Sequence, residues 1–203
     1  MMRKICSVFF WLGLAVGSVM IAGCATKVER IDAAQVRDLS GAWNDTDSRL
    51  VSEEMIADSL ARPWIDEHQR QHRKPPAVIV GEVRNLSHEH VNTNTFVGDL
   101  ERAFLNSGRV AMVASQKERG EIRTERRDMD LNASESTRKA MGQETGADYL
   151  LTGTINTIID ASGTDQIRFY QVDLTLISLT DNRKVWLGQK KIKKDVQRSK
   201  LRF

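Results

Sequence analysis

Ile167-Arg-Phe-Tyr-Gln-Val-Asp-Leu-Thr-Leu-Ile-Ser-Leu179 is the stretch of sequence that decides the fold. Apolar residues alternate with polar ones along it, which predicts a strand with one buried face. Thr180–Arg183 then predicts a turn, and Val185–Ile192 predicts a strand that returns alongside the first. Ala147–Ile159, which precedes the stretch, predicts a further strand. The carboxyl-terminal part of the chain is therefore expected to be a β-meander. The alternating residues of the deciding stretch are Tyr170, Val172, Leu174 and Leu176.

The sequence before the meander predicts strands that alternate with helices. Ala77–Val83 is a short apolar run rich in β-branched residues, which is typical of a buried strand. Apolar residues then recur at helical spacing until Ser107-Gly108 ends the helix, and Arg109–Val113 predicts a second strand. Strand–helix–strand–helix followed by a meander indicates an α/β (α+β) fold with a single small mixed β-sheet flanked by helices. The residues at helical spacing are Phe96, Leu100, Phe104 and Leu105.

Three further helices are predicted from caps and apolar spacing. Asp47-Ser48 is expected to cap an amphipathic helix, and Pro63 is expected to kink or break it. Ser115 opens a strongly charged helix, Lys117–Arg127. Asn132 with Glu135 predicts a capping box, with Gly146 following the end of that helix. The apolar stripe of the first helix comprises Leu50, Val51, Ile56, Leu60 and Trp64.

The amino terminus has the layout of a secretory signal peptide. Arg3-Lys4 precedes an apolar run that closes on Met20-Ile-Ala-Gly-Cys24. The cysteine after Ala-Gly resembles the lipobox of bacterial lipoproteins. The resemblance implies that the Cys24 thiol receives a diacylglyceryl group, that the leader is then removed, and that the new amino terminus is acylated. An uncleaved transmembrane helix over Ile5–Gly23 is the alternative, because that run just reaches a spanning length. Glycine and serine dilute the run, which favours the lipoprotein.

These features divide the chain into a removed leader, residues 1–23, a lipidated tether, residues 24–46, and a globular domain, residues 47–203. Ala25 follows the lipobox cysteine where aspartate would favour retention at the inner membrane, so the resemblance implies the outer membrane. The tether is polar, short and free of proline. A flexible chain of about 22 residues has a root-mean-square span of roughly 26 Å.

Composition excludes several classes of protein. The chain has 30 Lys+Arg and 27 Asp+Glu, and the leader removes only Arg3 and Lys4, so the mature chain is nearly neutral. A nucleic-acid binder would show a one-sided basic field. The two cysteines, Cys6 and Cys24, allow neither a disulfide framework nor a cysteine-based zinc site in the mature domain. The basic stretch from Lys190 is interpreted as an edge strand guarded by lysines, with contact to an anionic partner or to lipid headgroups as the alternative.

The sequence contains no recognisable catalytic motif, which predicts a protein that is not an enzyme and has no cofactor besides the covalent lipid. A nucleophile elbow, a phosphate-binding glycine-rich loop and a catalytic cysteine are all missing. His68 and His72 stand four apart, and His88 and His90 flank a glutamate in a polar loop. These pairs raise the alternative of a zinc or copper site. The favoured interpretation is that all four are solvated, with no metal bound.

Four short motifs between Ala77 and Lys191 together resemble the LpoB family, the lipoprotein activators of penicillin-binding proteins. Each motif alone is weak, but their order, spacing and coupling to a lipobox are moderately specific. They are Val80-Gly-Glu-Val-Arg-Asn85, the Phe96–Gly108 helix with Val110-Ala-Met-Val113, Gly146-Ala-Asp-Tyr-Leu-Leu-Thr-Gly153 and Val185-Trp-Leu-Gly188.

The resemblance implies a fold related to the amino-terminal domain of the TolB translocation protein, and an outer-membrane anchor facing the periplasm. It also implies that the domain binds a bifunctional penicillin-binding protein and activates peptidoglycan synthesis without catalysis. A periplasmic accessory lipoprotein of a secretion system, similar to CsgG, is the alternative. Candidate docking surfaces are the Asn85–Asn94 loop, the Lys117–Arg127 helix and the Asp160–Gln166 loop, each of which also suits ordinary solvent exposure.

Overall fold

The computed structural model describes residues 27–136 and 144–197. The predicted signal peptide and the lipidation site at Cys24 therefore lie outside the described residues, and both stay predictions. The fold described below belongs to the compact unit that begins at Val36.

The deciding stretch forms the central strand of a long antiparallel meander, as predicted. β3 (Tyr149–Ser162), β4 (Asp165–Ser178) and β5 (Lys184–Gln197) each span 14 residues. β3 and β4 stay paired to the Ser162–Asp165 end, and β5 follows β4 as far as Gln197. The strands are longer than predicted because their far ends carry polar and exposed residues, so the backbone pairing continues where the apolar alternation stops.

The meander joins two parallel strands in one mixed sheet, which confirms the predicted fold class. The strand order is β2-β1-β3-β4-β5, with β1 (Ala77–Asn85) parallel to both of its neighbours. The prediction of a strand over Arg109–Val113 was too long, because β2 comprises only Ala111–Met112. β2 therefore pairs with only the first two residues of β1.

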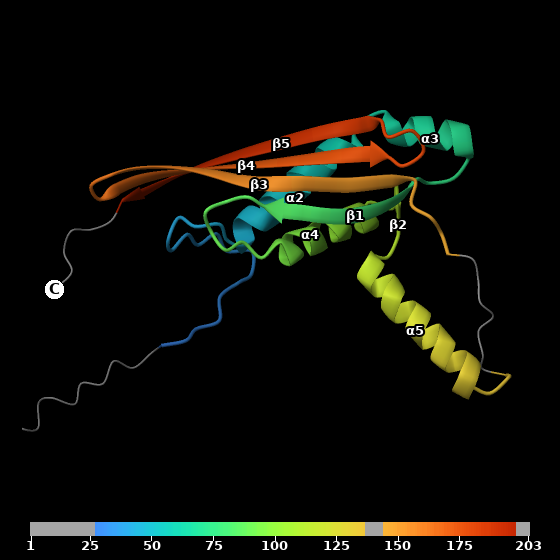
Figure 1. Ribbon diagram of the computed structural model, residues 1–203. Coiled ribbons are helices and arrows are strands. Elements are labelled where there is room, and N and C mark those ends of the chain that lie inside the picture. Colours follow the sequence, from blue (N-terminus) through green and yellow to red (C-terminus); the bar gives the residue numbers. More distant parts are fainter. Residues whose placement is uncertain (1–26, 137–143, 198–203) are drawn as a thin grey trace, which may run out of the picture. The chain divides into compact units, whose positions relative to one another are not determined.

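Two helices cover one face of this sheet and enclose the core (Figure 1). α2 (Asp45–Leu60) packs on α4 (Thr93–Asn106), and the pair contacts β5 and β1. Leu50 and Leu105 were wrongly predicted to be buried: each lies one residue away from its helix's buried stripe, and they are 47% and 58% exposed. The fully buried residues include Val51, Ile56, Phe96, Leu100, Phe104, Leu151, Ile155, Val172, Leu174 and Leu176.

The segment just before α2 belongs to the folded domain. Asn44, and not Asp47-Ser48, caps α2: its side chain accepts from the Asp47 backbone, and the Asp47 carboxylate accepts from the Asn44 backbone, both at 3.0 Å. Trp43 packs edge-on against Phe96 and Tyr170. The predicted tether therefore ends several residues before Thr46, because residues from Gly41 onward pack on the domain.

Pro63 interrupts the amino-terminal helix as predicted, and α3 (Trp64–His72) begins directly after it. Arg73 takes a left-handed conformation and ends α3 just before Pro75 and Pro76. α3 lies at the end of the sheet where β4 leads into β5 (Figure 1).

α5 (Gln116–Asn132) is the strongly charged helix expected after Ser115. Its capping box joins Ser115 and Glu118, and the helix has no buried residue. The predicted capping box at Asn132 was wrong, because Asn132 is the last residue of α5 and the chain turns extended at Ala133. α5 extends past the predicted end at Arg127, as far as Asn132. Most of the helix predicted up to Gly146 falls on residues 137–143, outside the described residues.

Gly188 of the meander lies where another side chain approaches closely. A Cβ on Gly188 would lie 2.2 Å from the Trp186 ring, which folds across this position. The indole of Trp186 thereby reaches α2 and donates to Asp58 Oδ2 at 2.8 Å. This hydrogen bond, followed by the ion pair with Arg62, lowers the pKa of Asp58. The Trp-x-Gly motif thus fixes β5 to α2.

Candidate functional site

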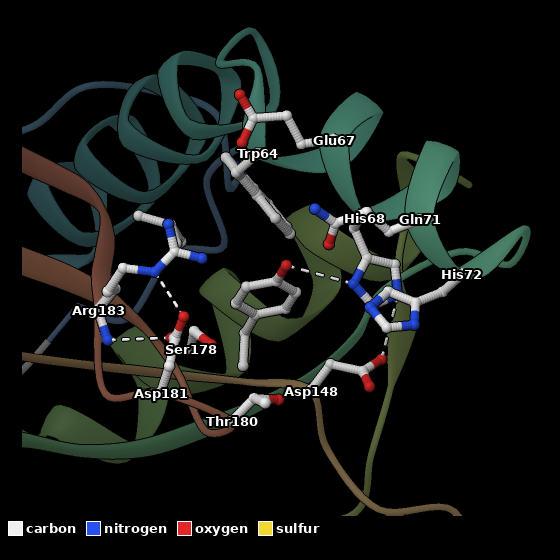
Figure 2. Close-up of a pocket in the computed structure, with 12 residues that line it drawn as sticks. Trp64, Glu67, His68, Gln71, His72, Asp148, Ser178, Thr180, Asp181 and Arg183 are labelled. Atoms are coloured by element: carbon white, nitrogen blue, oxygen red, sulfur yellow. Dashed lines mark hydrogen bonds and ion pairs between the residues drawn. The ribbon is translucent and has the colours of Figure 1, made fainter.

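A polar cavity of about 140 Å³ lies between α3 and the nearby ends of the meander strands (Figure 2). Its walls come from three places in the sequence that the fold brings together: α3, the start of β3 and the β4–β5 turn. The lining side chains include Trp64, Glu67, His68, Gln71, His72, Asp148, Tyr149, Asp181 and Arg183.

Asp148 connects the strands at this cavity. Its carboxylate accepts from the Ala77 backbone at 2.8 Å, its backbone N–H donates to Ala77 O at 2.7 Å, and its carbonyl accepts from Leu179 at 2.9 Å. These bonds join the starts of β1 and β3 to the end of β4. The Ala-Asp-Tyr motif therefore has a structural role, which the sequence indicated only as a helix stop entering a strand.

His68 is buried beside Asp148, with 3% of its surface exposed. Its Nδ1 lies 3.2 Å from the hydroxyl of Tyr149, and its Nε2 lies 3.5 Å from Asp148 Oδ2 without a hydrogen-bond partner (Figure 2). Tyr149 in turn packs edge-on against Trp64. The prediction that all four histidines are solvated was wrong for His68, because Pro63 starts a new helix that turns His68 toward the sheet.

The histidines do not assemble a metal site among the residues that the structure describes. His72 stacks on His68 with ring centroids 4.5 Å apart, whereas His88 and His90 lie in the loop after β1. His88 is held by Thr157, whose Oγ1 is 3.1 Å from its Nδ1. Nowhere in residues 27–136 or 144–197 do three metal-binding side chains gather as a metal would require.

The surroundings of His68 predict a stability that depends on pH. Burial lowers the pKa of His68 below its ordinary value of 6.5, with Asp148 opposing and His72 and Lys74 adding to the shift. Because the folded pKa is depressed, the unfolded chain takes up the proton first. The contribution of His68 to the free energy of unfolding is therefore fully present above pH 6.5, and it is lost as the pH falls through the folded pKa of His68.

We expect the free energy of unfolding, measured by urea titration across this pH range, to fall on the acid side. A His68→Gln variant should flatten the acid-side decline, whereas His90→Gln, in an exposed loop position, should keep it. An unchanged slope in His68→Gln would show that other groups cause the decline.

A second polar cluster, centred on Glu89, lies toward the opposite end of the sheet. The Glu89 carboxylate accepts from Arg168 at 2.7 Å and from the Tyr170 hydroxyl at 2.8 and 2.9 Å. It also accepts from the Trp43 backbone at 3.1 Å. Burial, and then the hydrogen bond to Glu89, raise the pKa of Tyr170, so this hydroxyl remains a donor. The Glu89 cluster thus holds the segment before α2 against β4.

Lys194 on β5 makes a second attachment for this segment. Its ammonium contacts Asp38 at 2.8 Å, Asp47 at 2.6 Å and the Ala42 carbonyl at 3.2 Å, and its side chain is 11% exposed. Burial opposes the charged form, but the two carboxylates outweigh it and raise the pKa of Lys194. The basic stretch that contains Lys194 was interpreted as guarding an edge strand or contacting an anionic partner, and the structure shows that Lys194 binds Asp38 in the segment before α2.

The predicted docking surfaces are separate in the structure. The loop after β1 supplies Glu89 to its cluster, α5 is exposed along its length, and residues 160–166 form the exposed tip of the β3–β4 hairpin. Sequence reasoning missed the Glu89 cluster. The available signal was Tyr170, a tyrosine on a buried strand face whose hydroxyl needs a partner. Its partner is distant in sequence, in a loop without apolar periodicity.

The fold is a small α+β domain, and its buried polar groups at Asp148, Glu89 and Lys194 join strands, helices and the segment before α2. None of its described helices is both long and apolar enough to cross a bilayer. A family model described as "Peptidoglycan-synthase activator LpoB" matches residues 47–192. The chain therefore belongs to the LpoB family.

Solved structures similar to this chain include members of that family. The NMR structure of Escherichia coli LpoB is 13% identical, with 89% of this chain and 85% of that chain covered and a TM-score of 0.42. The LpoB carboxyl-terminal domain from Salmonella enterica is 16% identical over 64% of this chain and 93% of that chain, with a TM-score of 0.34. Lipoprotein GNA1162 from Neisseria meningitidis is 16% identical over 60% and 84%, with a TM-score of 0.37. None of the curated protein sequences matches.

Proposed function

We propose that this chain is an outer-membrane lipoprotein, acylated at Cys24, that binds and activates a bifunctional penicillin-binding protein from the periplasmic side. The observation that supports this proposal is the match of the LpoB family model to residues 47–192. The lipobox-like Met20–Cys24 supports the proposed lipid anchor. Ala25, which follows the cysteine in place of aspartate, supports the outer membrane as its location.

Activation of a synthase requires no catalytic residue in the activator. A partner raises the activity of an enzyme by binding its active conformation more tightly than its inactive one. A domain whose buried polar groups hold strands and helices together suits this role, because it presents a fixed surface. His68, Asp148 and Tyr149 are accordingly assigned to stability and not to chemistry.

The tether limits how far the domain reaches from its anchor. Asp38 is bound by Lys194, so the part of the predicted tether that precedes this attachment, Ala25–Arg37, is 13 residues of sequence. A flexible chain of about 13 residues has a root-mean-square span of roughly 20 Å, shorter than the span expected for the whole predicted tether. We infer that the activator meets its synthase close to the outer membrane, and that a longer tether increases activation in cells.

The test uses a soluble form of the chain that begins at Ala25, directly after the cysteine that would carry the lipid. It is added in turn to each purified bifunctional penicillin-binding protein of the same cell. We expect the rate of glycan polymerisation from lipid II to rise with one of these synthases, and to saturate as more of the chain is added. Absence of both binding and rate change with every synthase would contradict the proposal.

The anchor is tested separately from activation. Labelled palmitate fed to the cells should be incorporated into the parent chain and not into Cys24→Ser, since lipidation requires the thiol. Cys6→Ser, a change inside the predicted leader, is the matched control and should keep the label. A parent chain that carries no label and keeps its leader would indicate the spanning helix instead.

A further inference from the structure

The outer edge of β1 is open along most of its length. β2 pairs only with Ala77 and Val78, so no described strand pairs with this edge from Ile79 to Asn85. The carbonyls of Pro76 and Val78 accept from Ala111 and Val113 on the β2 side, each at 2.9 Å. Alternation along a strand turns the backbone of Val80 toward the same side, beyond the end of β2.

The edge remains open beyond the irregularity in β1. The register with β3 shifts between Val80 and Val83, and Glu82 O accepts from Thr152 there at 2.8 Å. Leu86 N then donates to Ile155 O on the β3 side at 2.8 Å, so alternation turns Val83 toward the open side. β1 therefore offers strand-type backbone groups on both sides of the bulge.

A groove of about 730 Å³ runs beside this edge. One wall is the edge of β1 from Val80 to Val83, and α4 supplies Thr93, Asn94, Val97 and Glu101. The cap and first turn of α5 form the remaining wall, through Ser115, Gln116, Lys117, Glu118 and Gly120. In Figure 1 β1 runs past the short β2 with α4 beneath it. The shape fits one extended polypeptide segment, which would pair with β1 at the spacing of neighbouring strands, about 4.8 Å.

The groove is lined by more acidic than basic side chains, which favours a positively charged occupant. Glu82, Glu101 and Glu118 line it against a single cation, Lys117. Burial, and then the neighbouring Glu118, raise the pKa of Glu101, so an arriving cation would relieve an unfavourable environment. Neither Glu82 nor Glu101 has an ion-pair partner among the described residues. A second copy pairing edge to edge would bring two acidic grooves together, and like charges opposed across strands are destabilising.

We propose that the β1 edge groove is a docking site for an extended, basic segment of a partner protein, which adds as a strand beside β1. Backbone hydrogen bonds to Val80 and Val83 hold the segment, and Glu82 and Glu101 select its lysine or arginine side chains. This proposal does not depend on the identity of the synthase, since the groove would accept such a segment from any partner that presents one.

The probe is an acetylated and amidated heptapeptide that alternates valine with lysine. Added to the soluble mature chain, it should cause saturable shifts of the backbone amide resonances of β1 and of the groove walls on α4 and α5. Two matched peptides test the mode of binding: one carries glutamate in place of lysine, and one is N-methylated on alternate backbone amides. Both should bind at least tenfold more weakly, because each lacks one of the two proposed interactions.

Variants of the chain test the groove itself. Glu82→Gln and Glu101→Gln should each weaken binding about threefold, as expected for partly exposed ion pairs. Glu121→Gln removes a charge from an exposed position of α5 outside the groove and is the matched control, with unchanged affinity expected. No binding at millimolar peptide, equal binding of the glutamate peptide, or shifts confined to other surfaces would overturn the proposal. So would self-association of the chain through this edge, seen by sedimentation, because the occupant would then be a second copy.

Discussion

Replacing Gly153 with alanine should destabilise the domain by about 3 kcal/mol, the upper range for forcing an extra carbon into a packed interior. Gly153 lies on β3 and pairs with Leu174 of β4. A Cβ there would lie 2.3 Å from the backbone oxygen of Asp173 and 2.5 Å from a methyl of Leu174. The methyl can rotate away, but the backbone oxygen moves only with its strand. We therefore expect β3 and β4 to separate locally.

The matched control for Gly153→Ala is Gly98→Ala. Gly98 lies within α4, and a Cβ there would meet no atom within 4 Å. Alanine is favoured over glycine inside a helix by roughly 0.5–1 kcal/mol, so this variant should be slightly more stable. Urea unfolding of both variants measures the two effects. Equal stabilities would show that β3 and β4 have room for a side chain at Gly153.

Replacing Glu89 with alanine should lower the free energy of unfolding by about 3–5 kcal/mol, the usual cost of removing one partner from a buried ion pair. Glu89 and Arg168 have side chains that are 16% and 13% exposed, respectively. The change leaves the Arg168 guanidinium without its carboxylate and removes the acceptor of the Trp43 backbone. It also removes the closer acceptor of the Tyr170 hydroxyl, which keeps only the Gly41 carbonyl at 3.2 Å. The segment before α2 should then detach more readily from β4.

Two measurements distinguish the Glu89 cluster from a general loss of stability. Glu89→Gln keeps an acceptor but removes the charge, so it should fall between the parent and Glu89→Ala. Glu82→Ala removes an exposed carboxylate of β1 and should change stability by less than about 0.5 kcal/mol. Trypsin should cleave after Arg37 faster in Glu89→Ala under native conditions. Unaltered cleavage together with unaltered stability would contradict the assigned role of Glu89.

The fold was largely predictable from sequence because its core follows simple periods. Alternation in β4 and the spacing of Phe96, Leu100 and Phe104 identify the buried faces directly. Strand ends were missed where polar residues occupy both faces, since backbone pairing has no side-chain signature there. β2 was overestimated because Arg109–Val113 has a strand-like composition, whereas only two of its residues pair with β1.

The polar clusters were much less predictable than the core. His68 is buried because the break at Pro63 redirects the chain, and the angle between α2 and α3 is not encoded in local spacing. The partners of Glu89 come from β4 and from the segment before α2, up to 81 positions away. Contacts between such distant positions depend on the assembled sheet. Apolar periodicity in the sequence therefore predicts which helix and strand faces are buried, but it does not predict which charged side chains pair between these elements.

The attachments at Lys194 and Glu89 also decide where mechanical load enters the domain. If Cys24 carries the proposed lipid anchor, a pull on that anchor would travel along the chain to Asp38 and reach β5 through Lys194 before it strains α2. Lys194 pairs in register with Arg168, near the hairpin end of the sheet, whereas Asp148 and Arg183 lie at the other end. The force would thus act on the end of the sheet that contains Lys194. The end that carries α3 would bear little of it.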